Sequence, residues 1–283
     1  MNRLFKGFYT VATGMVAQQR KTEILTNNMA NANTPGFKSD QSTIRSFPDM
    51  LMSAVSSTTV PTEHGFALKK LDTVGAVNAG VYLQETPANY QQGSIYETDF
   101  RTDVALIDGQ LPIDAASGNQ GAIFFRLENP NGGESYTRNG NFTLDGEGYL
   151  VSPNGLYVLS GNGERMQFTN DNFTISQDGT IIDENGQQAG TLGVAFSANP
   201  DLLVKQDNGL YNTTDNTALP SAYNQNGVTF SMQQSYLESS NVDAARSMTE
   251  LMTAYRAFEA NQKVLQAYDK SMDKAVNEIG RVN

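Results

Sequence analysis

The residues that could perform chemistry in this chain are few, because its 283 residues include one histidine, no cysteine and no tryptophan. The histidine, His64, lies between Glu63 and Gly65, and no serine sits in the nucleophile-elbow pattern that would complete a Ser-His-Asp triad. The lack of cysteine excludes thiol catalysis, disulfides and thiolate metal sites. We therefore predict a protein that is not an enzyme, with no catalytic residue, no cofactor and no bound metal.

The 30 acidic residues are the other candidates for chemistry. Asp108, Asp145 and Asp178 each precede a glycine but lack the alternating acidic partners that a calcium loop requires, so we interpret them as turn residues. Paired carboxylates could imitate a glycosidase dyad, yet no particular pair stands out in the sequence. An extracellular β domain that binds or cleaves carbohydrate or cell wall, carried on a helical stalk, therefore stays open as an alternative.

The charge of the chain is unevenly distributed. The formal net charge is −11, and residues 46–230 carry 21 acidic and seven basic side chains, whereas residues 1–45 carry six basic and two acidic ones. An acidic protein with a pI of about 4.5 is poorly suited to nucleic acid as its main partner. No stretch approaches the roughly 18 apolar residues of a membrane span, and the N-terminal segment lacks a continuous apolar region, so we expect neither membrane insertion nor a cleavable signal peptide.

Two long helices are predicted at the ends of the chain. Residues 242–280 contain no proline, and their apolar residues recur at alternating steps of three and four, which is the pattern of a coiled-coil seam. Gln262 and Asp269 interrupt this C-terminal seam, and we expect the two to set its register. The apolar seam positions, which we predict to be buried in an assembly, are Leu251, Tyr255, Phe258, Leu265, Met272, Val276 and Ile279.

The N-terminal helix should end near Asn31, because Pro35 disfavours helix at the residue before it. Its own seam is diluted by Gln19, Thr22 and Thr26. The two terminal seams could pack against each other. Both seams are too polar for the two helices to form a strong coiled coil by themselves, so we expect neighbouring subunits to complete the seams.

Between the helices, the apolar period changes to two and turn signals recur at Asn139-Gly140, Asp145-Gly146 and Asn154-Gly155. We predict a mixed, mainly β fold, with an all-β antiparallel central body and long N- and C-terminal helices that form a coiled-coil stalk. The expected domains are a helix at 1–37, an extended arm at 38–96, the β body at 97–230 and a second helical domain at 231–283.

Several segments resemble, in order, the signature motifs of the bacterial flagellar rod and hook proteins, the axial family. Residues 26–38, TNNMANANTPGFK, are similar to the family's N-terminal signature. Further matches are D-V-A-L-I-D-G at 103–109, Y-T-R-N-G-N-F at 136–142, Q-S-Y-L-E-S-S-N-V at 234–242 and M-T-A-Y-R-A-F-E-A-N at 252–261; Ser235 stands where the family commonly has glycine. The residues that this resemblance marks for assembly are Gln18, Gln19, Asn27, Asn28, Ala30, Asn31, Asn33, Thr34, Pro35, Gly36 and Phe37.

The resemblance implies a structural subunit of the flagellar basal-body rod, of the proximal or distal rod type. Such a subunit would be exported by the flagellar type III apparatus and would polymerise helically through its terminal helices to transmit torque from motor to hook. Its partners would be copies of itself, other rod and hook subunits and the export apparatus. Its location would be the basal body, outside the cytoplasm and across the cell envelope.

Overall fold

The structure is a computed structural model, which describes residues 2–48, 50–60, 66–77, 80–84, 87–115, 118–206, 208–274 and 276–277. The chain forms two compact units. The helical unit comprises residues 1–27, 41–86 and 245–283, and the β unit comprises residues 28–40 and 87–244.

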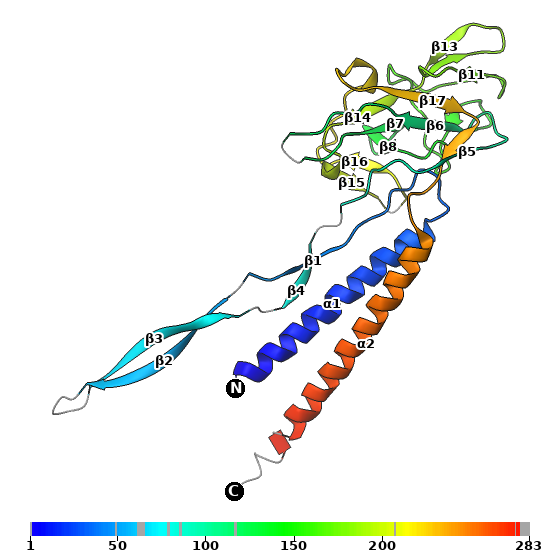
Figure 1. Cartoon of the computed structure of the whole chain (residues 1–283). Helices are drawn as coiled ribbons and strands as arrows, with labels where there is room; N and C mark the ends of the chain where they lie inside the picture. Colours follow the sequence, from blue (N-terminus) through cyan, green and yellow to red (C-terminus); the bar gives the residue numbers. More distant parts are fainter. Residues whose placement is uncertain are drawn as a thin grey trace. The chain divides into compact units, whose positions relative to one another are not determined.

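The helical unit contains two long helices and two antiparallel strand pairs. The helices are α1 (Asn2–Ala30) and α2 (Ala244–Lys274), and the strand pairs are β1 (Thr43–Ser46) with β4 (Val81–Gln84) and β2 (Met50–Val60) with β3 (Phe66–Val77) (Figure 1). The predicted end of the first helix is confirmed. The second helix begins close to its predicted start, and the residues after 277 lie outside the described part of the chain.

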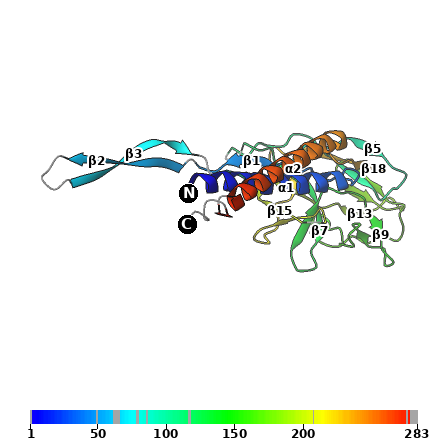
Figure 2. The same ribbon diagram turned by 90° about the horizontal axis from the view of Figure 1, so that it is seen from below.

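The helices α1 and α2 run side by side and antiparallel (Figures 1 and 2). A Cβ atom at Gly7 would overlap the Tyr268 hydroxyl, and one at Gly14 would lie 3.3 Å from Asn261 Nδ2. These glycines therefore let the helices approach closely. A coiled-coil stalk is not confirmed, because these facing positions are glycine, tyrosine and asparagine, whereas a coiled coil interlocks apolar side chains.

The predicted extended arm is partly visible as strands. The segment 53–60 lies in β2, which confirms extended backbone there, and 81–84 forms β4. Strand β2 begins at Met50, so extended backbone precedes the segment 53–60 as well. His64 lies outside the described residues.

The β unit confirms the prediction of many short antiparallel strands. Its largest sheet has five strands in the order β14-β7-β8-β16-β15, and β17 and β18 pair with β6 and β5. The strands are β5 (Ile95–Glu97), β6 (Val104–Asp108), β7 (Ala122–Glu128), β8 (Glu134–Thr137), β9 (Thr143–Leu144), β10 (Leu150–Val151), β11 (Thr174–Ile175), β12 (Thr180–Ile182), β13 (Gln188–Thr191), β14 (Val194–Ser197), β15 (Leu203–Lys205), β16 (Tyr211–Thr213), β17 (Phe230–Gln234) and β18 (Tyr236–Glu238), with short 3₁₀ helices at Pro200–Leu202 and Ala222–Asn224.

One turn recurs through this unit, at 145–149, 152–156, 160–164, 176–180 and 183–187. In each, the first carbonyl accepts from the N–H of a glycine three residues on, and the first N–H donates to the carbonyl four residues on. Each glycine has a positive φ, which suits a type I turn followed by a left-handed residue. The turns predicted at Asp145 and Asn154 are confirmed.

The turn predicted at Asn139-Gly140 is wrong. The strand before it, β8, pairs with β7 and β16 rather than with β9. The Gly140 carbonyl instead accepts from the Val104 N–H at 3.0 Å, and a Cβ at Gly140 would overlap the Val104 carbonyl oxygen. The glycine thus serves a close approach of two backbones.

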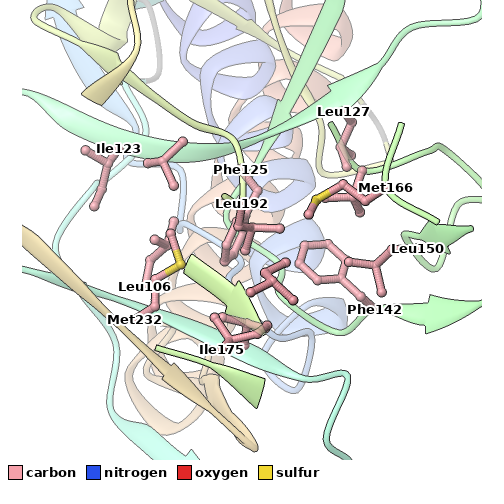
Figure 3. Close-up of a cluster of buried hydrophobic side chains, with 14 of the residues drawn as sticks. Leu106, Ile123, Phe125, Leu127, Phe142, Leu150, Met166, Ile175, Leu192 and Met232 are labelled. Atoms are coloured by element: carbon pink, nitrogen blue, oxygen red, sulfur yellow. The ribbon is translucent and has the colours of Figure 1, made fainter. Parts of the chain in front are cut away.

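The core of the β unit lies around β7, whose two faces are both buried. Ile123, Phe125 and Leu127 join the larger apolar cluster, which Figure 3 shows, whereas Ala122 and Phe124 join a second one. A strand covered on both faces is expected to be continuously apolar, and the first four residues of β7, AIFF, are.

Ser235, between β17 and β18, adopts a left-handed conformation with φ 62°. Its N–H donates to the Asp103 carbonyl at 2.8 Å and its carbonyl accepts from Thr98 N–H at 2.7 Å, so the backbone is fixed there. A residue with a side chain is destabilised by about 1–2 kcal/mol in this conformation, and glycine relieves that strain. Glycine also makes the unfolded chain more flexible, which offsets about 0.5–1 kcal/mol of the relief. Ser235→Gly should therefore raise the free energy of unfolding by about 0.5–1 kcal/mol. Urea unfolding of Ser235→Gly and Ser235→Ala checks this, and equal stability of the two variants would contradict it.

Candidate functional site

Four of the signature segments meet at a buried ionic cluster, formed by Lys38, Asp108, Arg138 and Glu238. The Glu238 carboxylate lies between two cations, with Oε1 at 2.7 Å from Lys38 Nζ and Oε2 at 2.6 Å from Arg138 Nε. Arg138 Nη2 also lies 2.7 Å from Asp108 Oδ1. Lys38, from the N-terminal part of the chain, and Arg138, from its centre, therefore share the carboxylate of Glu238, from its C-terminal part.

The cluster is almost sealed from water and its polar atoms are satisfied. The side chains of Lys38, Arg138 and Glu238 are 2%, 2% and 1% exposed. The lysine also donates to the Gln91 carbonyl at 2.8 Å, the arginine to the Ile123 carbonyl at 2.9 Å, and Gly93 N–H donates to the glutamate at 2.8 Å. Charges are tolerated at such depth only when they are paired and hydrogen-bonded.

The electrostatics keep Glu238 ionised. Burial alone would raise the pKa of its carboxyl, but the charges and hydrogen bonds of Arg138 and Lys38 outweigh burial and lower the pKa below the ordinary value. Burial likewise opposes the charge on Arg138, and the carboxylates of Glu238 and Asp108 more than compensate, so the pKa of Arg138 is raised. The charge on Arg138 therefore depends on the carboxylates.

The N-terminal signature enters the cluster through Gly36. Its N–H donates to the Glu238 carbonyl at 2.8 Å, its φ is +68°, and a Cβ would lie 2.5 Å from the Arg138 carbonyl oxygen. No other residue type fits both the conformation and the space. Next to it, the Phe37 ring lies 4.0 Å from Lys205 Nζ.

A second set of contacts fixes the same segment from its other side. Asn28 Nδ2 donates to the Asp40 carbonyl at 2.8 Å, and Asp40 N–H donates back to Asn28 Oδ1 at 2.9 Å. Lys205 Nζ donates to Asp40 Oδ1 at 2.9 Å and to the Lys38 carbonyl at 2.8 Å. Residues 28–40 are thus a structural part of the β unit.

Two amide side chains of the C-terminal signature also bind backbone groups elsewhere in the β unit. Gln234 accepts from the Ile175 N–H at 3.0 Å and donates to the carbonyls of Phe173 and Arg101 at 2.9 and 2.8 Å. Asn241 accepts from Ser39 N–H at 2.8 Å and donates to the Asn89 carbonyl at 2.7 Å. Each amide satisfies backbone groups on segments that are distant in sequence.

The predicted N-terminal residues divide into two groups. The cluster region brings together Asn28, Gly36 and Phe37, which are all buried, and Thr34 Oγ1 donates to Asn31 Oδ1 at 3.1 Å within the turn. Of the others, Gln18 and Pro35 are half-buried, and Gln19, Asn27, Ala30 and Asn33 are exposed. Their role in assembly stays a prediction.

The predicted C-terminal seam is likewise divided. Its half-buried members are Leu251, Phe258, Leu265 and Met272, on the side of α2 that also carries the buried Ala254. Tyr255 and Val276 are 53% and 72% exposed, and Ile279 lies outside the described residues. The predicted assembly role of these residues also remains a prediction.

The residues that hold the cluster together were not predicted as site residues. Lys38, Arg138, Gln234, Glu238 and Asn241 all stand inside the matched motifs, but no single motif contains a complete ion pair. Charge is the signal that could have identified them. Lys38, Arg138 and Glu238 are each the only charged residue of their motif, and the two cations are opposite in sign to the glutamate.

A small cavity of about 30 Å³ lies next to the N-terminal signature, and Gly36, Phe37, Thr137 and Asn139 are among the residues that line it. In the described part of the chain, no group of three or more His, Cys, Asp or Glu could hold a metal ion. None of the described helices is long and apolar enough to cross a membrane.

Comparison with known proteins gives three matched regions. Residues 8–38 match the family "Flagella basal body rod protein", residues 120–183 match "Flagellar hook protein FlgE/F/G D1 domain", and residues 233–278 match "Flagellar basal body rod FlgEFG protein C-terminal". The first and last of these regions contain Lys38 and Glu238.

Individual relatives match over almost their whole length. The flagellar hook-basal body complex protein FlhO of Bacillus subtilis is 43% identical over 280 residues, covering 99% of this chain and 100% of the relative. The flagellar basal-body rod protein FlgG of Bacillus subtilis is 32% identical, covering 97% and 99%. The flagellar basal-body rod protein FlgF of Caulobacter vibrioides is 29% identical, covering 97% and 98%.

The cluster predicts a large effect of a small substitution. Glu238→Gln keeps the size of the side chain but leaves two buried cations without their shared anion, so the free energy of unfolding should fall by about 3–5 kcal/mol. Glu97→Gln, at an exposed glutamate on the neighbouring strand β5, is the matched control and should change it by less than about 0.5 kcal/mol. Urea unfolding at pH 7 measures both, and similar values for the two variants would refute the role of the cluster.

The lowered pKa of Glu238 also predicts a pH dependence. A carboxyl whose pKa is lower in the folded state stabilises the fold above its unfolded pKa, here about 4.5, and loses that contribution as the pH falls through the folded value. The stability difference between the wild type and Glu238→Gln should therefore shrink as the pH falls below about 4.5. Urea unfolding at a series of pH values tests this; a difference that stays constant down to the acid limit would contradict it.

Proposed function

Because the chain belongs to the family of flagellar basal-body rod and hook proteins and is a structural rod subunit, we propose that it polymerises helically through its terminal helices. Its place is the flagellum, where it assembles with other rod and hook components. In this proposal the polymer transmits torque from motor to hook, and the chain performs no catalysis.

The observation that carries the proposal is the row of apolar side chains exposed on the helices. On α2, Met248, Met252 and Tyr255 are 47%, 47% and 53% exposed, at steps of four and three. On α1, Tyr9 and Val16 are 62% and 49% exposed, one heptad apart. Such rows are a liability on a lone subunit, and helical polymers bury them through repeated heterologous contacts.

We further propose how the parts of the chain divide the work. The helices α1 (Asn2–Ala30) and α2 (Ala244–Lys274) would form the inner part of the polymer as a coiled coil completed by neighbouring copies. The β unit, which includes residues 28–40 and the strands β17 and β18, would lie outside. The exposed seam residues Tyr255 and Val276 support this, since they are available to a second copy.

Delivery is proposed to occur through the flagellar type III export apparatus, to a final position outside the cytoplasm that crosses the cell envelope. Two properties of the chain are compatible with transport in an unfolded state. It has no cysteine and hence no disulfide, and most of its strands are short.

The helix proposal is tested by removing exposed apolar groups without removing the helix. Met252→Ser with Tyr255→Ser should abolish incorporation into purified basal bodies and swimming, because the buried contacts between copies are lost. Thr253→Ser with Glu259→Gln, at exposed polar positions of the same turns, should leave both unchanged. Circular dichroism checks that both variants keep their helix content, and normal incorporation of the Met252 and Tyr255 variant would sink the proposal.

A further inference from the structure

The segment 232–241, which we call the closing strap, contacts several segments of the β unit that are distant in sequence. It contains β18 and most of β17, and these strands pair with β5 and β6, more than 100 residues earlier in the chain. Three of its side chains, Gln234, Glu238 and Asn241, bind groups on other segments.

The strap also completes the apolar core. Met232 is 2% exposed, lies in the larger apolar cluster and is paired with Leu106 of β6, beside which it appears in Figure 3. Leu237 is 3% exposed. Without the strap, the core would be open on the β6 side.

The consequences of a missing strap are mainly electrostatic. Lys38 and Arg138 would lose the carboxylate that both share, and Arg138 alone would keep a carboxylate partner, Asp108. The backbone groups at Phe173, Ile175 and Ser39 would lose the amide side chains that satisfy them. Unpaired charges and unsatisfied groups at such depth are among the most unfavourable changes a fold can undergo.

We propose that the closing strap is an obligatory part of the β body, so that the body holds its fold only while the strap is bound. Strap release and unfolding of the β7 core are then one event. The fold is accordingly coupled to the completion of the chain as far as Asn241. A chain that ends before the strap, or whose strap has yet to arrive, has a β body that remains unfolded.

This device has a use that rests on the proposed function. If the subunit is transported as an unfolded chain, a β body that cannot fold before the closing strap is present stays unfolded, and therefore transportable, until then. The coupling itself is a property of the isolated full-length chain, so its test does not depend on export or polymerisation.

Native-state hydrogen exchange on the full-length protein tests the coupling. Glu238→Gln should accelerate amide exchange of Leu237 in the strap and of Phe125 in β7 by the same factor, about 100-fold or more. Glu97→Gln should accelerate neither. If Glu238→Gln fails to fold, Gln234→Ala carries the same comparison, with the two amides again expected to change together.

The reciprocal variant makes the test sharper. Leu127→Ala, in β7, should accelerate exchange in the strap as much as in β7, because one opening exposes both. The proposal is overturned if either variant accelerates only its own segment, since the strap would then be an edge that detaches from a body that stays folded. Failure of this test leaves the helix proposal standing, and failure of the basal-body test leaves the strap standing.

Discussion

The β unit depends on one carboxylate that two buried cations share. Glu238 pairs with Lys38 of the N-terminal signature and with Arg138, which directly follows strand β8, and each of the three is nearly inaccessible to water. Removing any one member leaves a buried charge without compensation, which is far less favourable than losing an exposed ion pair. The first and last segments of the β unit are therefore held by electrostatics at one point, some 200 residues apart in sequence.

The two helices could be predicted from the sequence because the patterns that indicate them are local. The period of apolar residues, the proline after Asn31 and the absence of breakers after residue 242 predicted both α1 and α2. The contact between α1 and α2 could not be predicted in the same way. The seam pattern favoured a coiled coil, yet Gly7 and Gly14 face α2, and close approach at glycine depends on which faces meet.

In the β unit, the same limit appears at the glycines and at the charges. A glycine after Asn or Asp predicted a turn correctly at 154–155, whereas Gly140 serves a close approach to Val104, and nothing in its local sequence distinguishes the two cases. Lys38, Arg138 and Glu238 are separated by 100 residues each. Their pairing follows from the sheet topology, so the motifs indicated that these positions matter but not that they touch.

The cluster also helps to fix the register of strand β18. A buried ionic group adds little net stability compared with an apolar group of the same volume, so its value lies in specifying one arrangement. A shift of β18 by one residue would turn Glu238 away from both cations and move Leu237 out of the core. Gln234 and Asn241, on either side, bind fixed backbone groups and exclude the same shift. The polar residues of this signature thus select one pairing among the many that its short strands would otherwise allow.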